Sequence, residues 1–240
     1  MKNSTFKMGI RDGLPICFGY LAVSFSFGIF AISKGLSILE ATLMSLTNLT
    51  SAGQLAAVPI IASGGLLVEL ALAQLVINLR YALMSLTLSQ KLDDRVKLRD
   101  RFWIAFGNTD EIFAMSVSKP NPVTKWYMLG LILTPLIGWT SGTLIGAIIG
   151  DVLPLEIVSS LQVAIYGMFM AIVVPPAKKD TSILLCVLIA AALSCGFYYI
   201  PFLNTIPSGF TIIICAVVAS VIMAIAKPIK NEDKEDKNDG

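Results

Sequence analysis

Four ionisable side chains lie inside segments that are otherwise apolar enough to enter a membrane: Glu69, Arg80, Asp110 and Glu111. An ionisable group at the centre of a bilayer costs about 2.5–3.5 kcal/mol on insertion scales, so these side chains are expected to face protein, water or one another. An arginine can pair with a carboxylate that a neighbouring helix or a substrate supplies. A carboxyl group in an apolar setting takes up a proton more readily than it does in water. The residue types therefore indicate ion pairing and proton transfer inside the membrane.

Each of these side chains also has a purely structural interpretation. Arg80 could extend to the inner membrane surface, and Glu69 lies close to one end of its segment. Asp110 and Glu111 follow Gly107-Asn108-Thr109, a typical helix start, where acidic residues interact favourably with the helix dipole. Adjacent residues of a helix point about 100° apart, so only one of the two acids can face the same cavity as Arg80. We favour Asp110.

A second polar feature interrupts an apolar stretch at residues 50–54, which read TSAGQ. Residues 38–49 and 54–63 are each long enough for a helix that crosses half a membrane at 1.5 Å per residue. If the chain bends between them, the second half-helix has Ser51 or Gly53 at its start. Its unpaired N–H groups and partial positive charge suit a substrate carboxylate. The alternative is a continuous helix whose small residues allow close helix packing.

Segment 66–89 carries polar residues on two sides when it is drawn as a helix. One stripe holds Gln74, Asn78, Tyr81 and Ser85, and the opposite stripe holds Glu69, Arg80 and Thr87. A helix with two polar faces is not expected to border lipid on either. The stripe around Asn78 is therefore predicted to line a substrate path.

The positioning elements are membrane helices. The chain has 240 residues, of which 55% are hydrophobic and 14% are charged, and a soluble domain carries nearer a quarter charged residues. We predict an all-α, polytopic integral membrane protein with about 6–8 hydrophobic helical segments, one or two of them broken or re-entrant. The apolar segments are 13–33, 38–62, 66–89, 102–118, 127–149, 155–174, 182–200 and 209–227. Residues 1–12 are expected to form a cytoplasmic segment, 13–227 the transmembrane transport domain, and 228–240 a charged, disordered cytoplasmic tail.

Lysine and arginine restrict the topology, because they concentrate in cytoplasmic loops. The basic loops are 1–11, 91–101, 119–125, 178–179 and 227–234. If every apolar segment spans the membrane, loop 91–101 lies outside with five basic residues. If segments 38–62 and 102–118 each enter and leave on one side, that loop lies inside. Both arrangements place the N- and C-termini in the cytoplasm and the chain in the cell membrane.

The polar motifs resemble those of the AzlC/YgaZ family, the large subunit of branched-chain amino acid exporters. The resemblance rests on GLPICFGYLAVSFSFG, TSAGQLAAVPII, VINLRYALMS and TDEIFAMS, which occur in this order along residues 9–227. It implies efflux of aliphatic amino acids together with a small membrane subunit of the AzlD/YgaH type. Family members often carry histidine or another aromatic residue after Asn-Leu-Arg, where this chain has Tyr81, and its TSAGQ segment is one residue shorter than theirs.

These observations combine into a prediction for the site. Substrate is expected to contact Ser51, Gly53, Gln54, Asn78, Arg80 and Tyr81, with proton coupling through Asp110 and Glu111. The predicted function is secondary, proton-coupled export of branched-chain amino acids. The alternative is a permease subunit of an ATP-driven system, with the ATPase on another chain because this sequence lacks a phosphate-binding Gly-x-x-x-x-Gly-Lys-Ser/Thr loop.

Other classes of function have no support in the sequence. Histidine is missing altogether, and no Ser-His-Asp, Cys-His or metal-ligand pattern indicates an enzyme, a metal or another cofactor. The four cysteines fall in apolar segments and are read as small buried hydrophobic residues. A net charge of +2 without a basic-aromatic patch gives no reason to expect nucleic acid.

Overall fold

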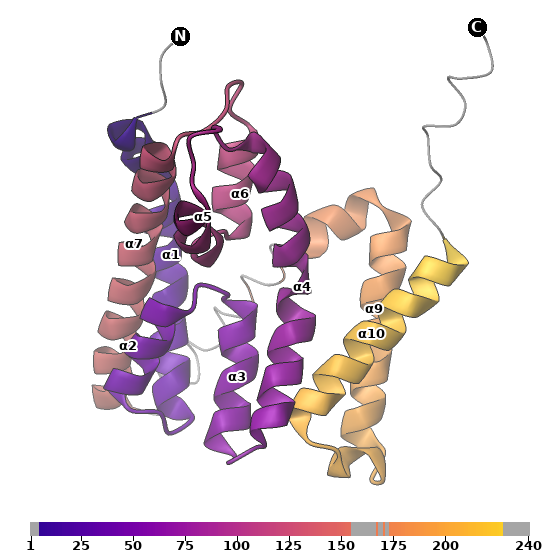
Figure 1. Ribbon diagram of the computed structural model, residues 1–240. Helices are drawn as coiled ribbons and strands as arrows, with labels where there is room; N and C mark the ends of the chain where they lie inside the picture. The colour runs from indigo at the N-terminus through magenta and orange to yellow at the C-terminus, as the bar shows by residue number, and fades with distance from the viewer. Residues whose placement is uncertain (1–4, 155–166, 168–169, 171–172, 228–240) are drawn as a thin grey trace, which may run out of the picture. The chain divides into compact units, whose positions relative to one another are not determined.

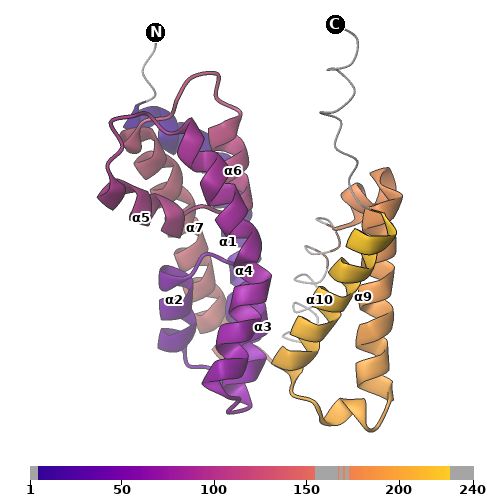
Figure 2. The same ribbon diagram turned by 45° about the vertical axis from the view of Figure 1, so that its right-hand side comes forward.

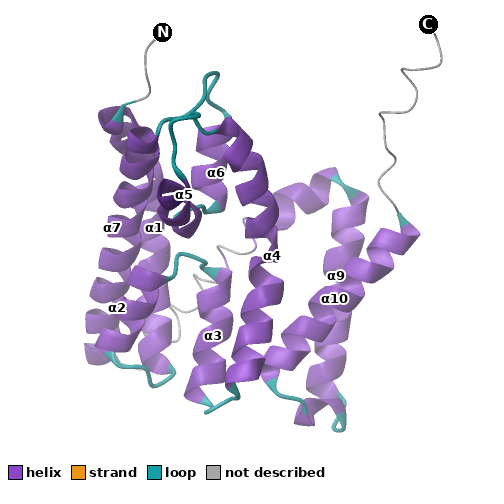
Figure 3. Cartoon of the chain, in the orientation of Figure 1, coloured by secondary structure: helices purple, strands orange, loops and turns teal. Residues whose placement is uncertain are grey.

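The computed structural model describes residues 5–154, 167, 170 and 173–227, which belong to two compact units, Met1–Phe169 and Met170–Gly240. The described residues form helices joined by loops, without a strand (Figure 3). Five of the described helices are long and apolar enough to cross a membrane, and two shorter apolar helices accompany them. The prediction of an all-α, polytopic membrane protein is therefore confirmed. Most of predicted segment 155–174 and the whole of tail 228–240 lie outside the described residues.

Three long helices form the frame of the first unit: α1 (Phe6–Ser33), α4 (Leu67–Lys91) and α7 (Lys125–Val152). Helix α1 begins at Phe6, seven residues before the predicted apolar segment 13–33. Residues 6–12 combine apolar and charged side chains, so the apolar pattern of the sequence begins later than the helix does.

Two broken helices complete this unit. The first consists of α2 (Ile38–Thr47) and α3 (Ala52–Ala62), and the second of α5 (Leu98–Phe106) and α6 (Asp110–Val117). In Figures 1 and 2, α2 and α3 occupy the end of the unit where α1 finishes, whereas α5 and α6 occupy the opposite end. Each pair therefore enters and leaves on one side, and the re-entrant alternative is the one that the structure has.

Local sequence explains where these half-helices start. Ser37 and Glu40 form a capping box at α2: Ser37 N donates to Glu40 Oε2 at 2.7 Å, and Glu40 N donates to Ser37 Oγ at 3.3 Å. At α5, Lys97 N donates to the Asp100 carboxylate at 3.3 Å, and this cap starts the helix inside the charged stretch 91–101. The sequence predicts a loop over residues 91–101, because the charged side chains there interrupt the apolar pattern that indicates a membrane helix.

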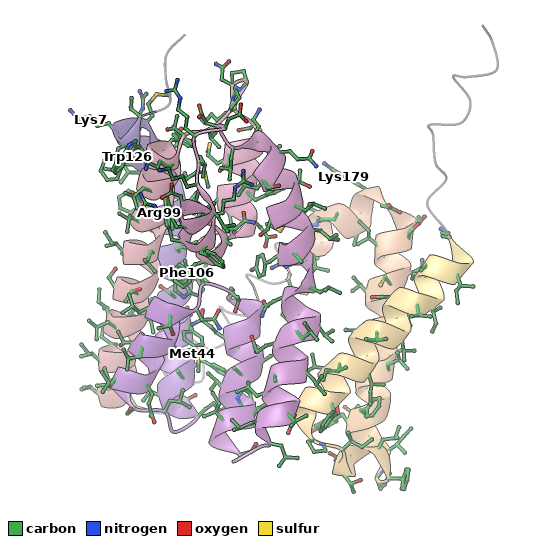
Figure 4. The ribbon with its side chains drawn as sticks, in the orientation of Figure 1. Lys7, Met44, Arg99, Phe106, Trp126 and Lys179 are labelled. Atoms are coloured by element: carbon green, nitrogen blue, oxygen red, sulfur yellow. The ribbon has the colours of Figure 1, made fainter. Side chains whose placement is uncertain are left out.

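Most of the described basic residues of the first unit lie at one end of it, with Lys34 at the opposite end and Arg80 in the middle of α4. Figure 4 labels Lys7, Arg99 and Trp126 near the end where α7 begins, and Phe106, the last residue of α5, lies deeper. The loop before α7 is fixed there by an ion pair of 2.7 Å between Lys119 and Asp12, whose carboxylate also accepts from the Tyr127 hydroxyl at 2.9 Å. The re-entrant topology thus brings basic loops to a common side, as the distribution of charges predicts.

Helices α1 and α7 pack closely along a row of glycines. Gly138, Gly142, Gly146 and Gly150 recur every fourth residue of α7 and lie against Cys17, Leu21, Phe25 and Ile29, also four residues apart on α1. A Cβ atom on Gly146 would stand 2.9 Å from Phe25 Cα, and one on Gly150 would stand 3.0 Å from Ile29 Cα. Small residues in such a row let two membrane helices approach to backbone contact. The four-residue spacing of these glycines is visible in the sequence.

The second unit contains α9 (Thr181–Tyr199), the short η1 (Leu203–Thr205) and α10 (Ser208–Ala226). Helices α9 and α10 form a hairpin. At the open end of this hairpin, Lys227 Nζ donates to Thr181 Oγ1 at 3.1 Å. The exposed Lys178 and Lys179 precede α9 at that same end. The described basic residues of this unit, Lys178, Lys179 and Lys227, therefore lie at one end of the hairpin.

Candidate functional site

The first break, between α2 and α3, is held in a strained conformation. Ser51 has φ +47° and ψ −80° and is the non-glycine residue with positive φ among those that the structure describes. Such a backbone costs about 1–3 kcal/mol and is found mostly at functional sites. The side chain of Asn48 supports the bend, because its Oδ1 accepts from Thr50 N at 3.2 Å. The predicted bend is present, and Ser51 stands at the N-cap position of α3.

Gly53 brings the start of α3 against the polar stripe of α4. Gln74 Nε2 donates to the Gly53 carbonyl oxygen at 2.8 Å, and Asn78 Nδ2 donates to Gln74 Oε1 at 3.0 Å. The carbonyl can only accept, so it fixes the orientation of the Gln74 amide, which in turn fixes that of Asn78. This leaves Asn78 Oδ1 buried without a hydrogen-bond partner, and Thr50 Oγ1 is in the same condition. Two unsatisfied oxygens therefore flank the break.

Gln54 points to the other side of α3, into a buried network with α7. Its Nε2 donates to Ser45 Oγ at 3.0 Å, its Oε1 accepts from Trp139 Nε1 at 3.0 Å, and Ser45 pairs with Thr143 at 2.7 Å. Gln54 is 0% exposed and Trp139 is 3% exposed. The Gln54 amide is fully buried, and both its Nε2 and its Oε1 are hydrogen-bonded to protein. It therefore has a structural role and links the first hairpin to α7.

The second break, between α5 and α6, comprises Gly107, Asn108 and Thr109. Asn108 Nδ2 donates to Ser85 Oγ of α4 at 3.1 Å, while its Oδ1 is buried without a partner. Thr109 stands at the N-cap position of α6 but makes no capping bond through its side chain. Its hydroxyl instead lies 2.7 Å from the hydroxyl of Tyr20 on α1, which also lies 2.5 Å from Glu111 Oε2.

Arg80 joins α4 to the second hairpin. Its NH1 lies 2.7 Å from Asp110 Oδ2, its NH2 donates to the Tyr81 hydroxyl at 3.3 Å, and its guanidinium lies 4.9 Å from the centre of the Tyr81 ring. The side chains of Arg80 and Asp110 are 49% and 46% exposed. The Arg80–Asp110 pair therefore remains open on one side.

A cavity of about 130 Å³ lies beside α4 and α5 on the basic side of this pair. Its lining includes Ser85, Leu88, Ile104 and the side of Arg101. Ser85 is the residue that accepts from Asn108, so the cavity adjoins the second break.

Comparison with known proteins identifies the relatives of this chain. Residues 15–153, more than half of the chain, match the family described as AzlC protein. The chain belongs to the AzlC family. A protein of Archaeoglobus fulgidus, described as an uncharacterized membrane protein, is 33% identical to this AzlC-family chain over 179 residues, covering 74% of the chain and 78% of the relative. The inner membrane protein YgaZ of Escherichia coli K12 is 32% identical over 154 residues, 62% of either protein. No solved structure matches.

The family and its membrane relatives identify the chain as a membrane transport protein. Within this AzlC-family chain, the predicted site residues divide between the two breaks. Ser51, Gly53 and Asn78 meet at the first break, and the remaining side chains of the prediction, Arg80, Tyr81, Asp110 and Glu111, meet around the second. Gln54 belongs to neither group, because protein atoms occupy both ends of its amide.

Sequence reasoning missed Tyr20, Ser45, Trp139 and Thr143. Tyr20 and Trp139 are polar aromatic residues in long apolar helices, and a buried tyrosine or tryptophan usually requires a hydrogen-bond partner. This requirement indicates that Tyr20 and Trp139 each need a polar partner in the folded protein. Their partners lie more than 80 positions away along the chain, so no local spacing identifies them.

Proposed function

We propose that this AzlC-family protein is a secondary, proton-coupled exporter of branched-chain amino acids that works with a small AzlD-like membrane subunit. The observation that carries the proposal is the first break. The start of α3, which carries a partial positive charge, lies beside two buried oxygens without hydrogen-bond partners, Thr50 Oγ1 and Asn78 Oδ1. A zwitterion complements both features: its carboxylate suits the start of α3, and its ammonium group suits the two oxygens.

The side chains of the site receive separate roles in this proposal. Ser51, Gly53 and Asn78 contact the substrate, while Arg80 and Tyr81 line its path beside the ion pair with Asp110. Gln54 is reassigned from substrate contact to positioning, because it holds the tip of the first hairpin on α7. Proton coupling is proposed to take place at the pair of adjacent acids, Asp110 and Glu111.

The proposed partner would cover an open face of α4. Among the three long helices of the first unit, α4 is the least buried: 11% of an 18-residue apolar stretch of α4 is buried, compared with 39% in α1 and 50% in α7. Arg80 of α4 and its partner Asp110 of α6 are also half exposed, and a charged pair left against lipid is costly. A second membrane subunit packed on α4 would remove both exposures.

The orientation follows from the basic loops. We propose that the protein lies in the cell membrane and that the side with Lys7, Arg99 and loop 92–97 faces the cytoplasm. The basic end of the α9–α10 hairpin is proposed to face the cytoplasm as well. A cysteine introduced at the exposed Asp94, in a background without the four native cysteines, should react with an impermeant thiol reagent only after the cells are permeabilised. Labelling of intact cells at this position would reverse the proposed orientation.

Transport by purified components tests the proposed function. The protein and its small subunit, reconstituted into liposomes without an ATPase, should exchange external labelled leucine for internal leucine. Valine and isoleucine should compete, and lysine and glutamate should not. Flux that appears only when an ATPase and ATP are added would favour the ATP-driven alternative, and exchange without the small subunit would remove it from the mechanism.

A further inference from the structure

Tyr20 has one hydroxyl hydrogen and two oxygen neighbours. Its oxygen lies 2.7 Å from Thr109 Oγ1 and 2.5 Å from Glu111 Oε2. A hydroxyl can donate only one hydrogen bond. The direction of each hydrogen bond among Tyr20, Thr109 and Glu111 therefore depends on how many hydrogens the three groups carry together. Tyr20 comes from α1, whereas Thr109 and Glu111 belong to the tip of the second hairpin.

The direction of these hydrogen bonds depends on the proton of Glu111. When Glu111 is ionised it can only accept, so Tyr20 must donate to Glu111 and Thr109 must donate to Tyr20. When Glu111 has taken a proton from water, its carboxyl group donates to Tyr20. The Tyr20 hydrogen then turns to Thr109, whose own hydrogen is released for another acceptor. One proton thus reverses two hydrogen bonds at the start of α6.

Glu111, rather than Asp110, is the acid that contacts the Tyr20 hydroxyl. Asp110 instead forms an ion pair with Arg80 at 2.7 Å. Glu111 makes no ion pair among the described residues, and its side chain is exposed on one side. The titratable and charged groups around it are Tyr20 from α1, Arg80 and Tyr81 from α4, and Asp110 on its own helix.

The ring of Tyr20 also contacts the residue that holds the other hairpin. Tyr20 and Trp139 pack edge to face with their ring centres 5.2 Å apart. The Trp139 indole donates to Gln54 at 3.0 Å, and Gln54 holds the start of α3 beside the first break. A contiguous set of side chains therefore runs from Glu111 through Tyr20 and Trp139 to Gln54.

We propose that Tyr20 is a positioning residue that responds to the protonation of Glu111 and transmits it through Trp139 and Gln54 to the first break. The role in transport rests on the proposed function, whereas the response of Tyr20 to Glu111 can be measured without substrate. It assigns the coupled proton to Glu111 and leaves Asp110 as the partner of Arg80. The two hairpins then change together because they share these side chains.

The test uses Trp139 as its own reporter. The full chain carries three tryptophans, and Trp103→Phe with Trp126→Phe leaves Trp139 alone. We expect its fluorescence to titrate with pH in the absence of substrate, because the charge of Glu111 changes next to the ring that packs on the indole. Tyr20→Phe, which keeps the ring and removes the hydroxyl, and Glu111→Gln should each abolish this titration. Tyr198→Phe, at an exposed tyrosine of the second unit, is the matched control and should leave it unchanged.

The outcomes separate the relay from the proposed function. A titration with unchanged midpoint and amplitude in Tyr20→Phe or Glu111→Gln would overturn the proposal, as would a wild-type Trp139 that does not respond to pH. In liposomes, Tyr20→Phe should retain leucine exchange at equal pH and lose accumulation driven by a proton gradient. If leucine is not transported at all while the fluorescence behaves as expected, the proposed function fails and the link between Glu111 and Trp139 stands.

Discussion

Asp110→Asn and Arg80→Gln are each expected to abolish most leucine transport, because each leaves one charge of the Arg80–Asp110 pair without its partner inside the membrane. Breaking a fully buried ion pair costs about 3–5 kcal/mol. Because the pair is half exposed, its loss is expected to lower folding stability by only about 1–2 kcal/mol. An unpaired charge on the substrate path that raises the transport barrier by about 2 kcal/mol would slow transport roughly 30-fold. Initial rates of leucine exchange in liposomes, normalised to inserted protein, measure this effect.

The double variant Arg80→Gln/Asp110→Asn separates stability from transport. Without either charge, the protein should melt in detergent at a higher temperature than either single variant, because no unpaired charge remains. Its transport should stay defective, since both side chains line the proposed path. Lys125→Gln is a suitable control because Lys125 lies 3.8 Å from Asp100 near the basic end, a contact too long to contribute much. Wild-type exchange in the double variant would remove the pair from the mechanism.

Gly53→Ala is expected to inactivate the protein with a single added methyl group. A Cβ atom at Gly53 would stand 2.5 Å from Gln74 Oε1 and 3.2 Å from Asn78 Nδ2, so the side chains that define the first break must move. Overpacking of this kind costs about 1–3 kcal/mol. Gly19→Ala, in α1, is the matched control because its Cβ would meet nothing within 4 Å.

The two glycine variants are best compared by melting temperature and by leucine binding. Gly53→Ala should lose both stability and binding, whereas Gly19→Ala should be neutral or slightly stabilising because alanine favours a helix by about 0.5–1 kcal/mol over glycine. Leucine binding of wild-type strength in Gly53→Ala would show that the contact between α3 and α4 does not shape the site.

The sequence predicted the features that depend on local chemistry and on charge. The TSAGQ segment indicated the first break, and Gly107-Asn108-Thr109 indicated the second, because small and polar residues in an apolar stretch are poorly explained by an uninterrupted helix. Five basic residues in loop 91–101 favoured the re-entrant topology. The cost of isolated charges in a membrane predicted that Arg80 pairs with a carboxylate of the protein or of a substrate, and Asp110 was favoured as the acid that faces the same cavity. In the structure these two side chains form an ion pair.

The orientation of side chains across the two breaks was beyond local inference. Gln54 and Gly53 are adjacent, yet one faces Trp139 of α7 and the other faces Gln74 of α4. Which residue faces which neighbour depends on the strained turn at Ser51 and on the contact between α1 and α7. The link from Tyr20 to Glu111 joins residues 91 positions apart, so it is defined by the packing of the whole unit.

Binding of leucine and of its analogue without an amino group, 4-methylpentanoate, tests the zwitterion site most directly. Wild-type protein should bind leucine far more tightly than 4-methylpentanoate, because the buried Asn78 Oδ1 and Thr50 Oγ1 have no hydrogen-bond partner and can accept from an ammonium group. Asn78→Leu, which removes the acceptor, should lose this preference while melting near the wild-type temperature. Equal preference for leucine in Asn78→Leu and wild-type protein would contradict the assignment of the first break as the substrate site.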